Sequence, residues 1–384
     1  MRRLHYHLGK IACLCLLALL WVTQAAASKT ILIAFVGPLS GSSALYGQSL
    51  KNAAQLAIDE ANLQTNTIDG RRASFKLSVH DDKEDSNMAV VIANYLTRSD
   101  AVGVIGNINT ANSLVSAQIF DAVHLAHISP ASAGRDYTRK GYRSAFRAIG
   151  HDDQAIDLLL PYLRNELHIT RMAVINNRTH FGKGIGDLIE QAMREQNTDL
   201  LVRDTVSARS VDFNAALDHI RRVKAEAIFF AGNVEQAAML ARSIKRKNLK
   251  LRLITAMAGT ASTQFLSSAG AASEGVISLE YGLPPEQMPG WKKFYASYYK
   301  AFGDQINPFT VCAYDATKVL IAAIRQAGSS DRRTVVERLH AIRYQGAMGP
   351  ISFTPKGDLL KPFFTIYEVR NLKWQTVKVM QSPS

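Results

Sequence analysis

Short apolar segments that alternate with amphipathic segments constrain the fold of this chain more than any other feature. The run Ile31–Val36 ends at Gly37-Pro38, as a buried parallel strand does. Apolar residues between Leu50 and Ala61 then fall at helical spacing and form one stripe. Further strands are expected at 75–79 and 102–105, with a helix over 89–96. This order predicts a parallel sheet with helices on both faces.

The same alternation of strands and helices begins again after Gly150. Strands are expected at 172–175, 201–206, 227–230 and 251–255, and helices at 184–196, 213–223 and 234–247. Later segments 291–302 and 313–326 are typical of helices, and 363–379 of two strands joined at Asn371. Short connections such as 147–150 and 349–350 predict that the chain crosses between two lobes several times.

We therefore expect an α/β protein of two doubly wound parallel-sheet lobes joined by a multi-strand hinge. The N-terminal lobe is expected to comprise 28–148 plus 279–349, and the C-terminal lobe 149–278 plus 350–384.

The first 27 residues have the pattern of an export signal. Basic residues open the chain, the 12 residues Ile11–Val22 are apolar, and the small residues 25–27 offer a cleavage site before Ser28. The apolar run is shorter than the roughly 18 residues that a membrane span needs. Lipidation at Cys13 or Cys15 is disfavoured by Lys10 and Leu14. We expect a protein that is secreted to the periplasm by a cleavable signal.

Cleavage would leave Cys312 as the only cysteine, so no intramolecular disulfide is expected. It would also remove three basic residues, and the formal charge would fall from +13 to +10. Basic clusters at 221–224, 245–247 and 332–333 have no interleaved aromatic residues. This pattern favours solvated helix faces over a nucleic-acid surface.

Three turns rich in small residues follow predicted strands of the first lobe, at 37–41, 106–110 and 130–134. In open α/β sheets, ligands bind beyond the carboxyl ends of the strands. Small residues let a ligand approach the main chain there, and free amides at helix starts favour a carboxylate or another acceptor. Thr110 and Ser132 could add hydroxyl donors, or could simply cap the helices.

With these motifs the chain resembles the periplasmic leucine/isoleucine/valine-type solute-binding proteins of ABC transporters, which have the type I periplasmic binding protein fold. The resemblance covers nearly the whole chain after residue 28. It is carried by Gly37–Gly41 with Tyr46-Gly47, Asp81-Asp82, Val104–Thr110, Ser129–Ala133, Phe181–Gly184, Tyr314-Asp315-Ala316, and Gly349-Pro350 with Gly357-Asp358.

The resemblance implies a ligand site between the lobes. Its residues would be Tyr46, Ile108, Thr110, Ala131, Ser132, Ala133, Phe181, Asn233 and Met257. The first-lobe residues would anchor the head group of the ligand, and those of the second lobe would close over it. Three departures from the family are notable: Ala133 stands for a threonine, Asn233 for a tyrosine, and Met257 for a glutamate that pairs with the ligand ammonium.

An isolated buried ammonium is costly, so Met257 argues against an ordinary α-amino acid bound in the usual way. The sequence points instead to a ligand with an acceptor head and an apolar or aromatic body, such as an organic acid or amide. Asp152, Glu235 or Glu280 could also supply the missing charge, so amino acids remain open.

The other motifs in the sequence predict no nucleotide-binding, metal-binding or catalytic site. Gly182, Gly184 and Gly186 match neither a P-loop nor a dinucleotide fingerprint. His124 and His127 are interpreted as surface or turn histidines rather than metal ligands, and Asp81-Asp82 as solvated acids. Cys312 is interpreted as a buried structural thiol. We expect no catalytic residues, no metal and no cofactor.

The resulting hypothesis is the solute-binding component of a branched-chain-amino-acid-type ABC transporter. The protein would be a monomer whose two lobes close on a small amino acid, organic acid or amide. A permease in the inner membrane would recognise it, and no nucleic-acid partner is expected. The alternative function is that of a sensor that passes ligand occupancy to a signalling receptor. A third hypothesis, an exported enzyme, has the least support in the sequence.

Overall fold

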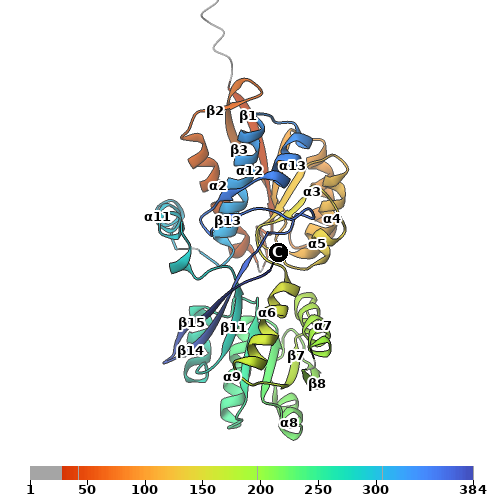
Figure 1. The fold of residues 1–384 in the computed structure, drawn as a ribbon, viewed down its shortest axis with the longest axis vertical. Coiled ribbons are helices and arrows are strands. Elements are labelled where there is room, and N and C mark those ends of the chain that lie inside the picture. The colour runs from red at the N-terminus through yellow and green to blue at the C-terminus, as the bar shows by residue number, and fades with distance from the viewer. Residues whose placement is uncertain (1–27, 42, 197, 305, 384) are drawn as a thin grey trace, which may run out of the picture.

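The computed structural model describes residues 28–41, 43–196, 198–304 and 306–383. The predicted export signal lies outside these residues. The described chain forms two lobes, one above the other in Figure 1, and each lobe is a sheet covered by helices. The predicted fold class is therefore confirmed.

The first lobe is built on a six-stranded sheet with the order β2-β3-β1-β4-β5-β6. All neighbouring strands are parallel except the edge pair β2 and β3. Its elements in the first part of the chain are β1 (Lys29–Gly37), α2 (Ala44–Asn62), β2 (Asn66–Ile68), β3 (Arg71–Asp81), α3 (Ser86–Thr97), β4 (Ala101–Gly106), α4 (Thr110–Asp121), β5 (Ala126–Ser129), α5 (Asp136–Arg139) and β6 (Ala145–Arg147).

The second lobe contains a seven-stranded sheet with the order β15-β14-β11-β10-β9-β7-β8. Its elements up to β11 are α6 (Asp152–Asn165), β7 (Arg171–Asn176), α7 (His180–Glu195), β8 (Asp199–Thr205), α8 (Asn214–Arg222), β9 (Ala227–Ala231), α9 (Val234–Arg246), β10 (Arg252–Ala256), α10 (Thr263–Ala269), η1 (Gly270–Ala272) and β11 (Ile277–Tyr281). The predicted C-terminal strand pair, β14 (Phe363–Arg370) and β15 (Lys373–Gln381), adds to this sheet antiparallel.

Between β11 and β14 the chain returns to the first lobe. This segment forms η2 (Pro285–Gln287), α11 (Trp291–Phe302), α12 (Thr310–Ala327), α13 (Arg332–Ala341), β12 (Tyr344–Gln345) and β13 (Pro350–Ile351). Helix α12 packs so closely on the first sheet that a Cβ on Gly103 of β4 would lie 2.7 Å from Leu320 Cδ2. The last helices therefore complete the core of the first lobe.

The chain crosses between the lobes in three places, after β6, after β11 and before β14. The boundary expected after residue 278 lies inside β11, which pairs with the second sheet from Ile277 to Tyr281. Beyond the boundary expected after residue 349, Ile351 and Phe353 still lie in the core of the first lobe. Strand pairing and core packing, rather than local sequence pattern, place these crossings.

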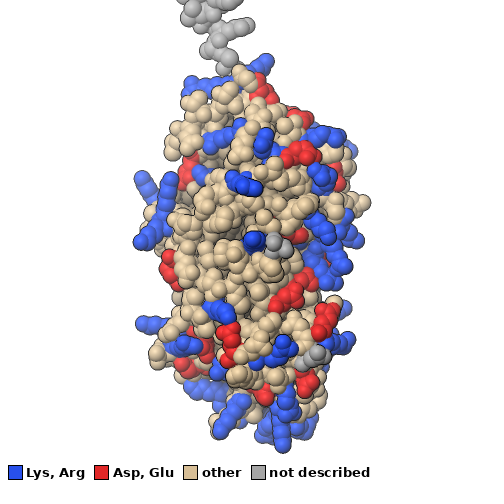
Figure 2. Space-filling model, viewed as in Figure 1, with Lys and Arg blue, Asp and Glu red and all other residues tan. Residues whose placement is uncertain are grey.

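Basic side chains gather at the end of the second lobe that holds α8 and α9 (Figure 2). Arg221, Arg222, Lys245 and Arg246 are exposed there, as expected of solvated helix faces. They lie in the last turns of their helices, where a positive charge is favourable. The cluster at 332–333 differs, because the Arg332 guanidinium donates hydrogen bonds to the carbonyl oxygens of Leu96, Thr97, Ser99 and Ala101.

Candidate functional site

The carboxyl ends of β1 and β4 meet at the turn 106–110, which is held by buried polar groups around Asn107. The backbone N–H of Asn107 donates to His127 Nε2 at 2.9 Å, and its side-chain Nδ2 donates to Asp82 Oδ2 at 2.9 Å. The Ser129 hydroxyl donates to the carbonyl oxygen of Asn107 at 2.6 Å. Strand β5 and the residue that follows β3 thus fix the position of one turn, although the sequence pattern predicted no role for Asn107.

Two expectations about this region are wrong. His127 is not a surface or turn residue, and Asp82 is not solvated, since both are fully buried. Burial lowers the pKa of His127 to about 3, so the ring is neutral and its Nε2 can accept a hydrogen bond. Asp82 accepts hydrogen bonds from the side-chain amides of Asn107 and Asn112, which replace its water.

The predicted hydroxyl donors of the first lobe make hydrogen bonds within that lobe. Thr110 Oγ1 accepts from the backbone N–H of Gly134 at 3.1 Å, which joins the two predicted binding turns. The Ser132 hydroxyl is fully buried and lies 2.6 Å from Ser113 Oγ. The N-cap of α4 is Asn109, whose side chain accepts from the backbone N–H of Asn112.

Arg147 fixes the turn 130–134. Its buried guanidinium donates to the carbonyl oxygens of Ser132 and Gly134 at 2.8 and 3.1 Å, and Nε lies 2.8 Å from Asp358 Oδ1. From the sequence, Arg147 is expected only as part of a connection between the lobes. An arginine within an otherwise apolar segment that precedes a lobe crossing is the signal that could have identified it; Arg147 is the last residue of the buried strand β6.

In the second lobe, Phe181 and Asn233 lie at the starts of neighbouring helices. Phe181 is the second residue of α7 and is 39% exposed, while Asn233 caps α9 by accepting from the backbone N–H of Gln236. The two helix starts are tied together because the backbone N–H of Asn177 donates to the carbonyl oxygen of Ala231 at 3.1 Å. An exposed aromatic ring therefore stands beside the carboxyl ends of β7 and β9.

Met257 and Glu280 lie at the carboxyl ends of β10 and β11, the next two strands of the second sheet. Met257 is only 4% exposed and packs in the second-lobe core. Glu280, at the end of β11, accepts hydrogen bonds from the backbone N–H groups of Gly259 and Ala261, at 3.1 and 3.2 Å. Burial raises the pKa of Glu280, and its hydrogen bonds partly oppose that rise.

Aromatic residues connect the two lobes at this point. The ring of Phe309, from the first lobe, lies 5.9 Å from Tyr46 and 5.8 Å from Tyr281, centroid to centroid. The Tyr281 hydroxyl donates to the Asp152 carboxylate, whose pKa is raised by burial. Burial, followed by the charges of Cys312 and Glu280, raises the pKa of Tyr46 well above 10. Tyr46 of the first lobe and Tyr281 of β11 therefore both pack against Phe309 at the junction between the lobes.

Segments of all three crossings line one small cavity of about 50 Å³ at this junction. Its lining includes Ile149 from the first crossing, Gly282 from the second and Pro362 from the third, together with Cys312, which is buried as predicted.

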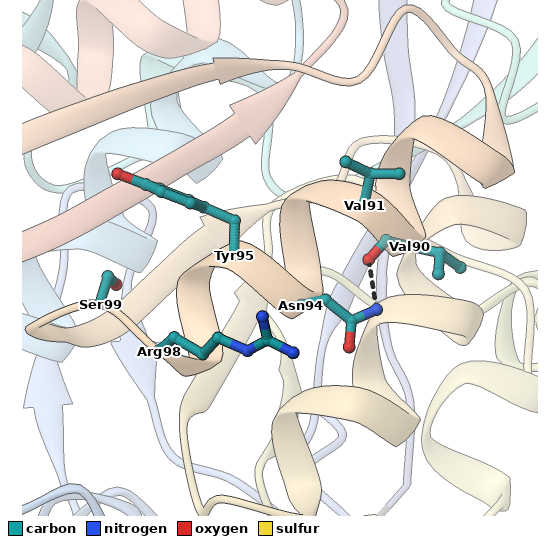
Figure 3. A pocket seen from close by; sticks show the side chains of 6 residues that line it. All are labelled: Val90, Val91, Asn94, Tyr95, Arg98 and Ser99. Atoms are coloured by element: carbon teal, nitrogen blue, oxygen red, sulfur yellow. Dashed lines mark hydrogen bonds between the residues drawn. The ribbon is translucent and has the colours of Figure 1, made fainter.

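A second pocket lies on helix α3, away from both edges described above (Figure 3). It is lined by Val90, Val91, Asn94, Tyr95, Arg98 and Ser99, and by none of the residues predicted to bind a ligand. In the described ranges, no three His, Cys, Asp or Glu side chains are grouped so as to hold a metal ion. None of the described helices has the length and apolar character of a membrane span.

Residues 30–371 match the family model described as periplasmic binding protein. The chain is 27% identical over 344 residues to the leucine-, isoleucine-, valine-, threonine-, and alanine-binding protein of Pseudomonas aeruginosa, covering 89% of this chain and 90% of that protein. It is 25% identical to Leu/Ile/Val-binding protein homolog 1 of Brucella suis, with 88% of each chain covered.

Solved structures share the fold. The leucine binding protein LivK of Thermotoga maritima superposes with a TM-score of 0.78 at 22% identity, covering 91% of this chain and 98% of LivK. A solute-binding protein of R. palustris in complex with benzoate superposes with a TM-score of 0.76 at 17% identity, covering 92% and 98%. Because the family model spans most of the sequence and the two-lobed fold agrees with it, this chain belongs to the periplasmic binding protein family.

Proposed function

We propose that the protein is the solute-binding component of a branched-chain-amino-acid-type ABC transporter, and that it binds a small amino acid, organic acid or amide between its lobes. The observation that carries the proposal is the family match combined with the packing of Tyr46 and Tyr281 on Phe309 at the lobe junction. Relatives named for leucine, isoleucine and valine support an amino acid, and the benzoate complex supports an organic acid.

The three crossings act as the hinge in this proposal. Each lobe binds part of the ligand, and closure is driven by contacts that form only when both lobes touch it. The closed monomer is then recognised by a permease in the inner membrane. The predicted signal in residues 1–27 would deliver the protein to the periplasm.

The test is a calorimetric titration of the chain from Ser28 onward with amino acids, aliphatic and aromatic acids, and amides. Phe181→Ala should weaken binding of the best compound at least about tenfold, because it removes a ring that contacts ligand in the closed form. Tyr95→Ala is the matched control, since Tyr95 is also an exposed ring, 61% exposed, but lies on α3.

Unchanged affinity in Phe181→Ala, with Tyr95→Ala also unchanged, would remove Phe181 from the site. Failure of every compound in the panel to bind wild-type protein would contradict the proposed function itself.

A further inference from the structure

A dense group of basic side chains lies at one end of the second lobe, where helices α8 and α9 finish and strands β9 and β10 begin. The two helix ends lie next to each other, because Lys247 Nζ, just after α9, donates to Asp218 Oδ1 of α8 at 2.7 Å. Figure 2 shows Lys and Arg side chains gathered there. The exposed cations of this region, here called the basic end, are Arg221, Arg222, Lys224, Lys245, Arg246 and Lys250.

Most of this positive charge has no acidic partner. In residues 28–41, 43–196, 198–304 and 306–383, none of the cations of the basic end forms an ion pair. Asp218 pairs with Lys247. The hydrogen bond from Lys247, together with the charges of Lys247, Arg221 and Arg222, lowers the pKa of Asp218. One carboxylate is therefore shared by three cations.

A purely structural role of these cations would be to offset the negative ends of the two helices. A helix C-terminus carries the equivalent of about −0.5 charge, so α8 and α9 together present about −1. Asp218 and the exposed Glu226 each add one negative charge. With Lys247 included, the cations of the region exceed these negative charges by about four. Compensation of the helix ends therefore explains only part of the basic end.

The surroundings of the basic end favour an anionic lipid bilayer as its partner. From residue 219 to residue 252 the aromatic residues Phe, Tyr and Trp are represented only by Phe229 and Phe230, and both are buried. The bases of a single-stranded nucleic acid would thus find no ring to stack on there. The predicted export signal would also bring the chain to a membrane rather than to nucleic acid. Anionic headgroups attract clustered Lys and Arg side chains without any pocket.

We propose that the basic end of the second lobe docks on the surface of an anionic phospholipid bilayer. The inference goes beyond the proposed function. Strands β9 and β10 begin at the basic end, and the predicted ligand residues Asn233 and Met257 lie just beyond their other ends. Five residues of a strand span roughly 15 Å. The docked protein therefore keeps its predicted ligand site away from the lipid.

The test is sedimentation of the chain from Ser28 onward with vesicles of phosphatidylcholine, alone or mixed with phosphatidylglycerol. Wild type should bind only the mixed vesicles. Raising the salt from about 0.01 M to about 0.15 M should weaken this binding at least about tenfold, because the screening length falls from about 30 Å to about 8 Å. The variant Arg221→Gln/Arg222→Gln/Lys250→Gln should bind the mixed vesicles at least about tenfold more weakly than wild type, since each lost charge lowers the attraction.

The matched control removes three exposed cations from β3 of the first lobe, as Arg71→Gln/Arg72→Gln/Lys76→Gln. Both triple variants have the same net charge, so their comparison separates the position of the charges from their number. The control should bind within about twofold of wild type, because charges far from the lipid are screened. Circular dichroism shows whether both variants fold. If the first variant does not fold, Lys250→Gln and Lys76→Gln give the same comparison with one charge each.

Three outcomes would overturn the inference: equal binding to both kinds of vesicle, no binding of wild type to either kind, or equal weakening in the two triple variants. Tighter binding to a DNA duplex than to mixed vesicles at the same phosphate concentration would also overturn it, in favour of a nucleic-acid surface. Titration of the same preparations with solutes is a separate measurement, so a failure of vesicle binding leaves the proposed function intact.

Discussion

Single residues of this protein show how burial changes acid–base behaviour. Asp82, Glu280 and Asp315 are all buried carboxylates that accept hydrogen bonds from amide groups. Burial raises the pKa of Asp315 from 3.8 to about 6, although the amides of Met348 and Ala347 oppose the rise. The folded protein therefore binds a proton at Asp315 more tightly than the unfolded chain does.

This shift predicts a pH-dependent stability. Below about pH 4, Asp315 is protonated in both the folded and the unfolded state; between about pH 4 and 6 only the folded state keeps the proton. Its contribution to the free energy of unfolding thus falls as pH rises through about 6, by at most about 3 kcal/mol. Urea unfolding of wild type and Asp315→Asn at pH 4 to 8 measures this contribution as the difference between their free energies of unfolding.

The stability of wild type relative to Asp315→Asn should therefore be greatest near pH 4 and smallest above pH 7. Exposed Asp331 offers a control of opposite sign, because hydrogen bonds from Thr334 lower its pKa. A difference between wild type and Asp315→Asn that does not change with pH would contradict the assignment.

At the scale of elements, glycines let helix starts approach strand ends. In α7, a Cβ on Gly182 would lie 2.2 Å from Asn177 Oδ1 and 2.7 Å from the carbonyl oxygen of Ala231. Gly184, two residues later in the same helix, has no atom within 4 Å of that position. The sequence shows two similar glycines, and only one is required by packing.

We expect Gly182→Ala to lower the free energy of unfolding by about 1–3 kcal/mol, since the added methyl forces α7 away from β9. Gly184→Ala should instead raise it by about 0.5–1 kcal/mol, because alanine favours the helix and meets no obstacle. Urea titrations of both variants measure the difference, and changes of the same sign would refute the packing argument.

At the scale of the whole molecule, Arg147 ties separate parts of the chain together. Its guanidinium contacts the turn at Ser132 and Gly134, the Thr138 hydroxyl, and Asp358 before the third crossing. The Thr138 hydroxyl also donates to Asp358 at 2.6 Å. One buried cation therefore holds a turn that is predicted to bind ligand and the segment before the third crossing.

Arg147→Met should destabilise the protein by about 3–5 kcal/mol, because Asp358 loses its cationic partner and the carbonyl oxygens of Ser132 and Gly134 lose the guanidinium donor. Arg143→Met is the control, since Arg143 is 59% exposed and pairs with an equally exposed Glu337; we expect a change below about 1 kcal/mol. Thermal melts of both variants measure these effects. Equal melting temperatures would show that Arg147 does not hold the segments together.

Local pattern predicted most of the elements. The strand expected at 172–175 is β7, the helix expected at 291–302 has those bounds, and the strands around Asn371 are β14 and β15. Several elements were not predicted, among them helix α6, strand β11, the short strand β6 and helix α13; the last two are too brief or too polar to show a period. The positions of the nine predicted site residues follow from the fold, while their contacts with a ligand stay a prediction.

The sequence by itself determined the two α/β lobes and the family, because strand and helix periods and turn motifs are local and repeat along the chain. Only the tertiary structure decided that β11 joins the second sheet, that His127 and Asp82 are buried, and that Glu280 reaches the turn after Met257. These facts depend on partners 20 or more residues away, such as His127 for Asn107, and a pattern of neighbouring residues carries no information about them.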